Sequence, residues 1–169
     1  MKKRRSRLRD SSPLEAWGGP ARSAGEGVAG CYEAAVRLLA SRAHSARELR
    51  LKLLRRGHPS DEIDAALERL REGGYLDDAA YARALIGRRS GGRGARAIAS
   101  ELAAKGVDRE VARTALAELS TEDELQAAQA LAERLCRAGP LDTERIGARL
   151  LRRGFSVEVA RAALRGLRL

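Results

Sequence analysis

The sequence contains few residues of the types that usually form disulfides, metal sites or catalytic sites. Of 169 residues, two are cysteine, two are histidine and 3% are aromatic. Cys31 and Cys136 belong to no C-x-x-C motif and have no histidine at ligand spacing, which argues against a disulfide framework and a zinc site. His44 precedes a predicted helix and His58 follows a glycine turn, so both are expected at the surface or as capping residues. We therefore expect no metal and no cofactor.

Motifs that carry enzymatic chemistry are also missing. The sequence has no G-x-x-x-x-G-K-[ST] phosphate loop, no G-x-S-x-G nucleophile elbow and no carboxylate pair in a plausible cleft. No apolar run approaches about 18 residues, and the basic start MKKRRSRLR is not followed by the apolar core of a signal peptide. These absences predict a cytoplasmic protein that is not an enzyme and does not enter a membrane.

The charge is strongly unbalanced. Lys and Arg number 33 against 23 Asp and Glu, which gives a net charge of +10, and nearly all the basic residues are Arg. The guanidinium fork binds phosphate and carboxylate in a bidentate manner, so this balance favours an acidic partner such as nucleic acid. The codon bias of a GC-rich genome would also produce a chain rich in Ala, Gly, Leu and Arg. Composition alone does not separate codon bias from the binding of an acidic partner.

Residues 45–78, SARELRLKLLRRGHPSDEIDAALERLREGGYLDD, form the clearest structural unit. Ser45 and Glu48 have the spacing of a capping box, in which the hydroxyl and the carboxylate each satisfy a free backbone N–H at a helix start. Leu49 and Leu53 then lie on one helix face, and Gly57 is the expected left-handed stop. One amphipathic helix is therefore predicted before the glycine.

A second helix of this unit is predicted to begin at Ser60. Tyr75 and Leu76 are expected to return to the core after it, before Asp77 or Asp78 caps the next helix. The inward residues of the second helix are predicted to be Ile63, Ala66, Leu67 and Leu70.

The same unit recurs twice, at residues 98–119 and 146–167. Its turn glycines, Gly57, Gly106 and Gly154, are about 50 residues apart, a period typical of repeat arrays. Counted from each glycine, position −8 is Leu49, Ile98 and Ile146; position −4 is Leu53, Leu102 and Leu150; position +9 is Ala66, Ala115 and Ala163; position +10 is Leu67, Leu116 and Leu164; and position +13 is Leu70, Leu119 and Leu167.

The remaining stretches complete each unit with a preceding helix. One is predicted at residues 31–42, with Val36 among its apolar residues, and another opens at a capping box of Thr121 and Glu124. The predicted fold is all-α: a disordered basic tail at residues 1–30 and three tandem three-helix repeats, at residues 31–77, 78–119 and 120–169, in an elongated array. The tail is either a solvated arm or a weak contact to phosphates.

Candidate binding residues are arginines that point away from the predicted core. The first set recurs at equivalent repeat positions and is expected on one outward strip: Arg47, Arg55, Arg96 and Arg152. Arg88 closes a helix and Arg93 lies in the glycine-rich joint SGGRG, where both are expected to converge with Arg96 on a partner.

The combination of HSARELRLKLLRRG, GYLDDAAYA, the ELAAKGV element and the third unit RLLRRGF resembles the RecX family, over about residues 31–169. The resemblance implies a bacterial regulator built of three three-helix repeats, which would bind the RecA filament and modulate, usually inhibit, RecA in recombination, DNA repair and the SOS response. We also expect a monomer that binds DNA weakly. The alternative from another class is a helical nucleic-acid-binding module, whose arginines would meet DNA phosphates directly.

Overall fold

The turn glycines impose the same local geometry at three places. The computed structural model describes residues 24–138 and 142–167, and in it Gly57, Gly106 and Gly154 have φ values of 84°, 75° and 89°. This left-handed conformation favours glycine, because glycine has no Cβ to clash. The conformation also directs the next backbone N–H back onto the helix that has just ended. The closing bonds run from His58 N to Leu53 O, from Val107 N to Leu102 O and from Phe155 N to Leu150 O, at 3.2, 3.1 and 3.2 Å.

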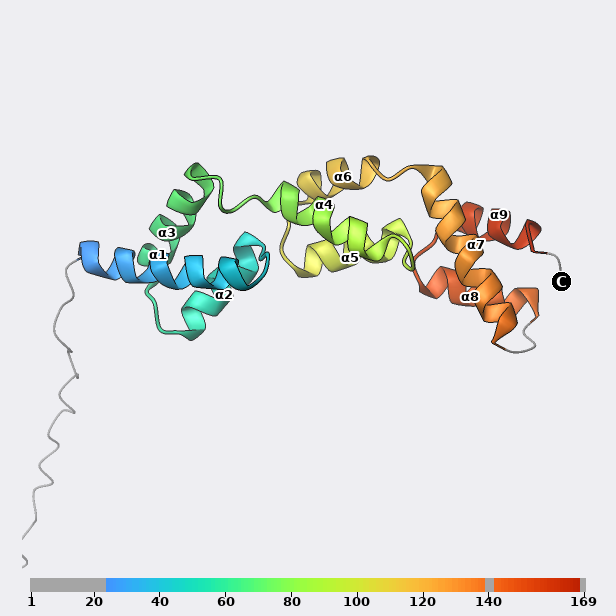
Figure 1. Ribbon diagram of the computed structural model, residues 1–169, viewed down its shortest axis with the longest axis horizontal. Coiled ribbons are helices and arrows are strands. Elements are labelled where there is room, and N and C mark those ends of the chain that lie inside the picture. The colour runs from blue at the N-terminus through green and yellow to red at the C-terminus, as the bar shows by residue number, and fades with distance from the viewer. Residues whose placement is uncertain (1–23, 139–141, 168–169) are drawn as a thin grey trace, which may run out of the picture.

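The described residues form nine helices and no strand, as the all-α prediction expected. They are α1 (Ala24–Ser41), α2 (Ala46–Arg55), α3 (Ser60–Glu72), α4 (Asp78–Arg89), α5 (Ala95–Ala104), α6 (Arg109–Ala117), α7 (Thr121–Arg137), α8 (Thr143–Arg152) and α9 (Val157–Arg165). Figure 1 shows them as three groups that follow one another along the long axis: group 1 (α1–α3), group 2 (α4–α6) and group 3 (α7–α9). No helix in this part of the chain is both long enough and apolar enough to cross a membrane.

Each group has its own apolar core rather than a share of one common core. The predicted inward positions −8 and −4 are fully buried in all three groups, and the alanines at +9 are buried as well. The leucines at +10 and +13 are buried in group 1 but only partly buried in groups 2 and 3, where the third helices, α6 and α9, are shorter than α3.

The predicted start of the first helix is wrong. Helix α1 begins at Ala24 rather than Cys31, so the boundary drawn for the tail at residue 30 falls inside a helix. Val36 is also wrongly placed, since it is 39% exposed. The buried face of α1 follows the spacing of Cys31, Ala35 and Leu38, and Val36 lies off that face. Residues 1–23 lie outside the described residues, and their predicted disorder stays a prediction.

Tyr75 does not enter the core, contrary to expectation. It is 67% exposed, whereas Leu76 is buried. The backbone N–H groups of both residues donate to Leu70 O, and Gly74, with a φ of 70°, reverses the chain just before them. This turn admits only one of two successive side chains to the core, and the aliphatic one occupies it.

Two of the predicted helix starts need correction. Asp77, Asp142 and Ser156 act as N-caps as expected. The cap of α7, however, is Ser120, whose Oγ accepts from Asp123 N at 3.0 Å, so the predicted box of Thr121 and Glu124 is displaced by one residue. Ser45 caps α2 as predicted, but the Glu48 carboxylate does not return to the helix start and bonds elsewhere.

The core assignment predicts large costs for truncation at position −4. Leu53→Ala and Leu102→Ala should each lower the free energy of unfolding by about 2 to 5 kcal/mol, because each removes a fully buried side chain. Urea unfolding followed by circular dichroism measures this change. Leu54→Ala is the matched control: Leu54 is 39% exposed and adjacent in sequence, so its effect should be well below that of Leu53. Equal effects at the two positions would contradict the assignment.

Candidate functional site

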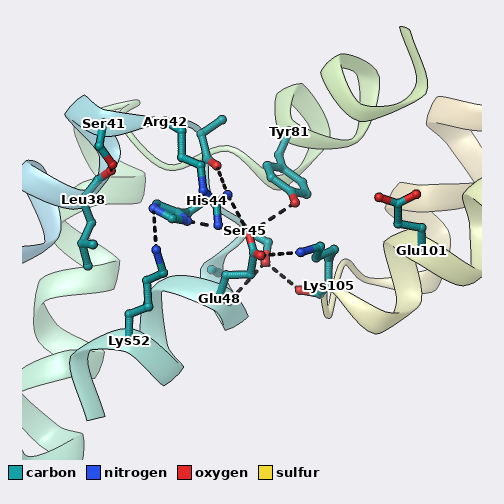
Figure 2. A network of polar contacts seen from close by, with 12 residues as sticks. Leu38, Ser41, Arg42, His44, Ser45, Glu48, Lys52, Tyr81, Glu101 and Lys105 are labelled. Atoms are coloured by element: carbon teal, nitrogen blue, oxygen red, sulfur yellow. Dashed lines mark hydrogen bonds and ion pairs between the residues drawn. The ribbon is translucent and has the colours of Figure 1, made fainter. Parts of the chain in front are cut away.

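Groups 1 and 2 meet where the start of α2 lies against the turn that follows α5 (Figure 2). Ser45 Oγ donates to Lys105 O at 2.6 Å while accepting from Glu48 N at 3.2 Å. The N–H of Ala46, the first residue of α2, donates to Asp78 Oδ1 at 2.9 Å. The free N–H groups of the α2 start are thus satisfied partly by group 2, which fixes how the two groups are joined.

Glu48 is the electrostatic centre of this joint. Its carboxylate, 15% exposed, accepts from Lys105 Nζ at 2.7 Å, from Tyr81 Oη at 3.3 Å and from Arg42 Nη1 at 3.4 Å. Burial alone would raise the pKa of Glu48, but the hydrogen bonds and charges of Lys105 and Arg42 outweigh it and lower the pKa to about 2. The charged carboxylate therefore holds together side chains from both groups.

His44 is buried beside this carboxylate, contrary to the expectation that it lies at the surface. It is 2% exposed, its Nδ1 lies 3.7 Å from Glu48 Oε2 without a hydrogen bond, and its Nε2 lies 3.4 Å from Lys52 Nζ. Burial, and then the charges of Arg42 and Lys52, lower the pKa of His44 below its usual range. Both effects favour the neutral form of this buried ring.

Groups 2 and 3 meet in an equivalent way. Gly94 N donates to Arg153 O at 3.0 Å and Ala95 N donates to Glu124 Oε1 at 2.9 Å. These bonds correspond to those of Ser45 and Ala46 in the first joint, with the start of α5 in place of α2 and the turn after α8 in place of the turn after α5. Both joints thus use the same pairing of a helix start with a glycine turn.

Glycine is required at this second joint by close approach. A Cβ on Gly94 would overlap the backbone of Gly154 and Phe155, and one on Gly154 would overlap Ala97. At the first joint a Cβ on Gly106 would overlap the aliphatic part of Arg47. The predicted binding residue Arg47 therefore lies at a contact between groups, although it is exposed.

Arg93, which was predicted to converge with Arg88 and Arg96 on a partner, pairs with a carboxylate of its own group. It is half-buried, and its Nη1 donates to Glu101 Oε2 at 3.0 Å, while Arg89 Nη2 donates to Glu101 Oε1 at 2.9 Å. Two arginines, one from the end of α4 and one from the following loop, thus share one carboxylate of α5. The charge of Arg93 is therefore paired within group 2.

The other four predicted arginines are exposed and form no ion pair within residues 24–138 and 142–167. They are Arg55 at the end of α2, Arg88 near the end of α4, Arg96 at the start of α5 and Arg152 at the end of α8. The described residues also contain no group of three or more His, Cys, Asp or Glu placed to hold a metal ion. These four side chains thus carry positive charge that no acidic side chain of the described residues pairs with.

Comparison with known proteins identifies the family of this chain. The sequence models of the first and second three-helix domains of RecX match residues 31–70 and 77–116. A regulatory protein RecX of Mycobacterium ulcerans is 40% identical over 133 residues, which cover 74% of this chain and 77% of that protein. The chain belongs to the RecX family.

Other RecX proteins extend the comparison. The regulatory protein RecX of Chromohalobacter salexigens is 40% identical over 133 residues, covering 77% of this chain and 88% of its own length. The crystal structure of RecX from Lactobacillus salivarius superposes with a TM-score of 0.77 at 22% identity, over 83% of this chain and 96% of that one. At that identity the structural likeness speaks for the fold alone.

Sequence reasoning misses the residues that join the groups of this RecX-family chain. From the sequence, the helix dipole suffices to explain Lys105, and Asp78 and Glu124 are expected to cap their own helices. Each instead bonds to a helix of the preceding group. The sequence does contain one signal for these contacts. Helices α2 and α5 both begin with an Ala that directly follows a Ser or a Gly, and this shared pattern indicates that the two helix starts are equivalent.

The close packing between groups 2 and 3 predicts that a single added methyl group at Gly94 destabilises the protein. Gly94→Ala should force the two groups apart and lower the melting temperature by several degrees, because the added Cβ meets backbone that cannot move independently. Small-angle scattering should show a changed radius of gyration. Gly91→Ala, in the same loop, is the matched control because nothing lies within 4 Å of its Cβ. A Gly94→Ala protein with unchanged melting and scattering would refute this joint.

The Glu48 network predicts a loss of stability in acid. The folded pKa is lowered from its ordinary value of 4.5 to about 2, so the contribution is complete above about pH 4.5 and disappears as the pH falls toward 2. Glu48→Gln should cost about 1 to 3 kcal/mol at pH 7 and progressively less below pH 4.5. Urea unfolding at several pH values measures the difference. Glu72→Gln, at an exposed glutamate, should give a small and nearly constant difference, and a constant difference for Glu48→Gln would contradict the network.

Proposed function

We propose that this chain regulates the RecA recombinase by binding the RecA filament and inhibiting its recombinase and ATPase activity, in recombination, DNA repair and the SOS response. The observation that carries the proposal is membership of the RecX family at 40% identity over most of the chain, with relatives named as regulatory proteins. The protein would act in the cytoplasm, as a monomer and without catalysis of its own.

The architecture supports a partner that is itself a polymer. We infer that α7–α9 is a third copy of the three-helix repeat, because group 3 repeats the helix order, the glycine turn and the buried positions of groups 1 and 2. The domain boundaries are then residues 31–77, 78–119 and 120–169, with α1 extending the first repeat to Ala24. An elongated body with a net charge of +10 suits a negatively charged filament groove.

The contact surface is proposed to include the predicted arginines that carry free charge. Arg55, Arg88, Arg96 and Arg152 are exposed, and within the described residues no acidic side chain pairs with them. Arg47 and Arg93 are secondary candidates, because one packs over Gly106 and the other pairs with Glu101. Free charges gain the most from a partner, since no internal pair must be broken first.

The second candidate function is direct action on nucleic acid, favoured by the arginine-rich surface. A nucleic-acid module would bind DNA tightly without RecA and with a steep salt dependence. A RecA regulator would change RecA activity at concentrations far below those that coat DNA. Titration of the protein into RecA ATPase and strand-exchange assays, alongside binding to DNA alone, separates the two.

The arginine assignment predicts a selective loss of function. Changing Arg88 and Arg96 together to Ala should weaken inhibition of strand exchange at least about tenfold, because removing one partner of a buried charge pair at an interface costs about 2 to 5 kcal/mol. Helical content and melting temperature should stay unchanged, since both side chains are exposed. The measurement is the concentration of protein that halves strand exchange.

Arg165→Ala, near the end of α9, is the control and should inhibit like the parent. If the double variant also inhibits like the parent, the contact surface lies elsewhere, and Arg55 with Arg152 is the next pair to change. If the parent itself leaves RecA unaffected, the regulatory proposal fails and the nucleic-acid module takes its place.

A further inference from the structure

A cleft of about 300 Å³ opens between the C-terminal halves of α7 and α8 in group 3. Four of the six residues that line it are arginines, and no acidic residue does so. The lining residues are Leu131, Arg134, Leu135, Arg149, Arg152 and Arg153. Of these arginines, only Arg152 was among the predicted binding residues.

This concentration of charge exceeds what the helix dipoles explain. A helix C-terminus carries about half a negative charge, so the ends of α7 and α8 together offer about one against four positive charges. Arg149 also lies three and four residues before Arg152 and Arg153 on one helix, a spacing at which like charges repel. Within the described residues none of the four arginines forms an ion pair.

The equivalent places in the other groups are balanced differently. Arg149 lies five residues before the turn glycine Gly154, and Glu101 holds that place in group 2. There the glutamate accepts from Arg89 and Arg93 at 2.9 and 3.0 Å. Group 3 thus has an arginine where group 2 has the carboxylate that pairs with Arg89 and Arg93, so no side chain lining the cleft supplies a negative charge.

We propose that the cleft between α7 and α8 binds a phosphate group, held by Arg134, Arg149, Arg152 and Arg153. Guanidinium groups bind phosphate oxygens in a bidentate manner, and a phosphate group brings more negative charge into a small volume than a single carboxylate does. The cleft is at the small end of ligand sites and has no aromatic side chain on which a base could stack. It therefore recognises phosphate and not the base or sugar attached to it.

Inorganic tripolyphosphate is the probe that tests this site on the full-length protein. Titration at low ionic strength should shift the Nε–Hε NMR signals of the four cleft arginines and raise the melting temperature. Arg149→Glu, which restores the charge found at Glu101, should weaken tripolyphosphate binding about tenfold or more and melt at a higher temperature than the parent without ligand. Arg149→Gln should show both effects to a smaller extent.

Arg161→Glu is the matched control, because it makes the same change of net charge on the exposed face of α9, away from the cleft lining. It should change tripolyphosphate affinity less than about twofold. Equal weakening by Arg149→Glu and Arg161→Glu would overturn the proposal, since only overall charge would then matter. A polyglutamate peptide that shifts the four signals where tripolyphosphate does not would overturn it in favour of a carboxylate site.

A single-stranded oligo-dT distinguishes the two sources of phosphate. If Arg149→Glu weakens oligo-dT binding as it weakens tripolyphosphate binding, and the two ligands compete, the cleft holds backbone phosphates. If oligo-dT affinity is unchanged while tripolyphosphate binding is abolished, the cleft holds a free phosphate compound. Both outcomes support the site, and neither depends on an effect on RecA, so this test and the regulatory proposal can fail separately.

Discussion

Contact between a helix start and a glycine turn is the constraint on which the arrangement of this protein depends. Within the described residues each three-helix group closes its own apolar core, and no buried cluster spans two groups. The free N–H groups at the starts of α2 and α5 help to position neighbouring groups, because they need acceptors and find them on the following group. Glycine at positions 94, 106 and 154 lets the backbones come close enough.

The two joints share this geometry but differ in charge. The first is reinforced by Glu48, which binds Lys105 and Arg42 beside the buried His44. The second has glycine where the first has Ser45, and relies on backbone bonds and on Glu124. The first joint therefore depends on a charged carboxylate, whereas the second depends on the close approach of backbones at Gly94 and Gly154.

The helical frame is repeated, whereas the side chains on it are not. One register position holds Lys52 beside His44 in group 1, Glu101 between two arginines in group 2 and Arg149 in a cleft of arginines in group 3. A single architecture thus presents three different electrostatic surfaces. The differences between the groups therefore lie in the charges of their side chains rather than in the arrangement of their helices.

The local structure is readable from the sequence because its causes are local. The spacing of Leu49 and Leu53, the glycine after each helix and the Asp or Ser before the next act within a few residues, so helices, turns and most buried positions follow from the pattern. The predictions that are wrong at Glu48 and Glu124 have a common cause. Each carboxylate could satisfy the start of its own helix or a group that is distant in sequence, and the distant contact prevailed. The sequence therefore determined the helices, the glycine turns and most of the buried positions, and only the tertiary structure decided which charged side chains pair with one another and which stay unpaired within the described residues.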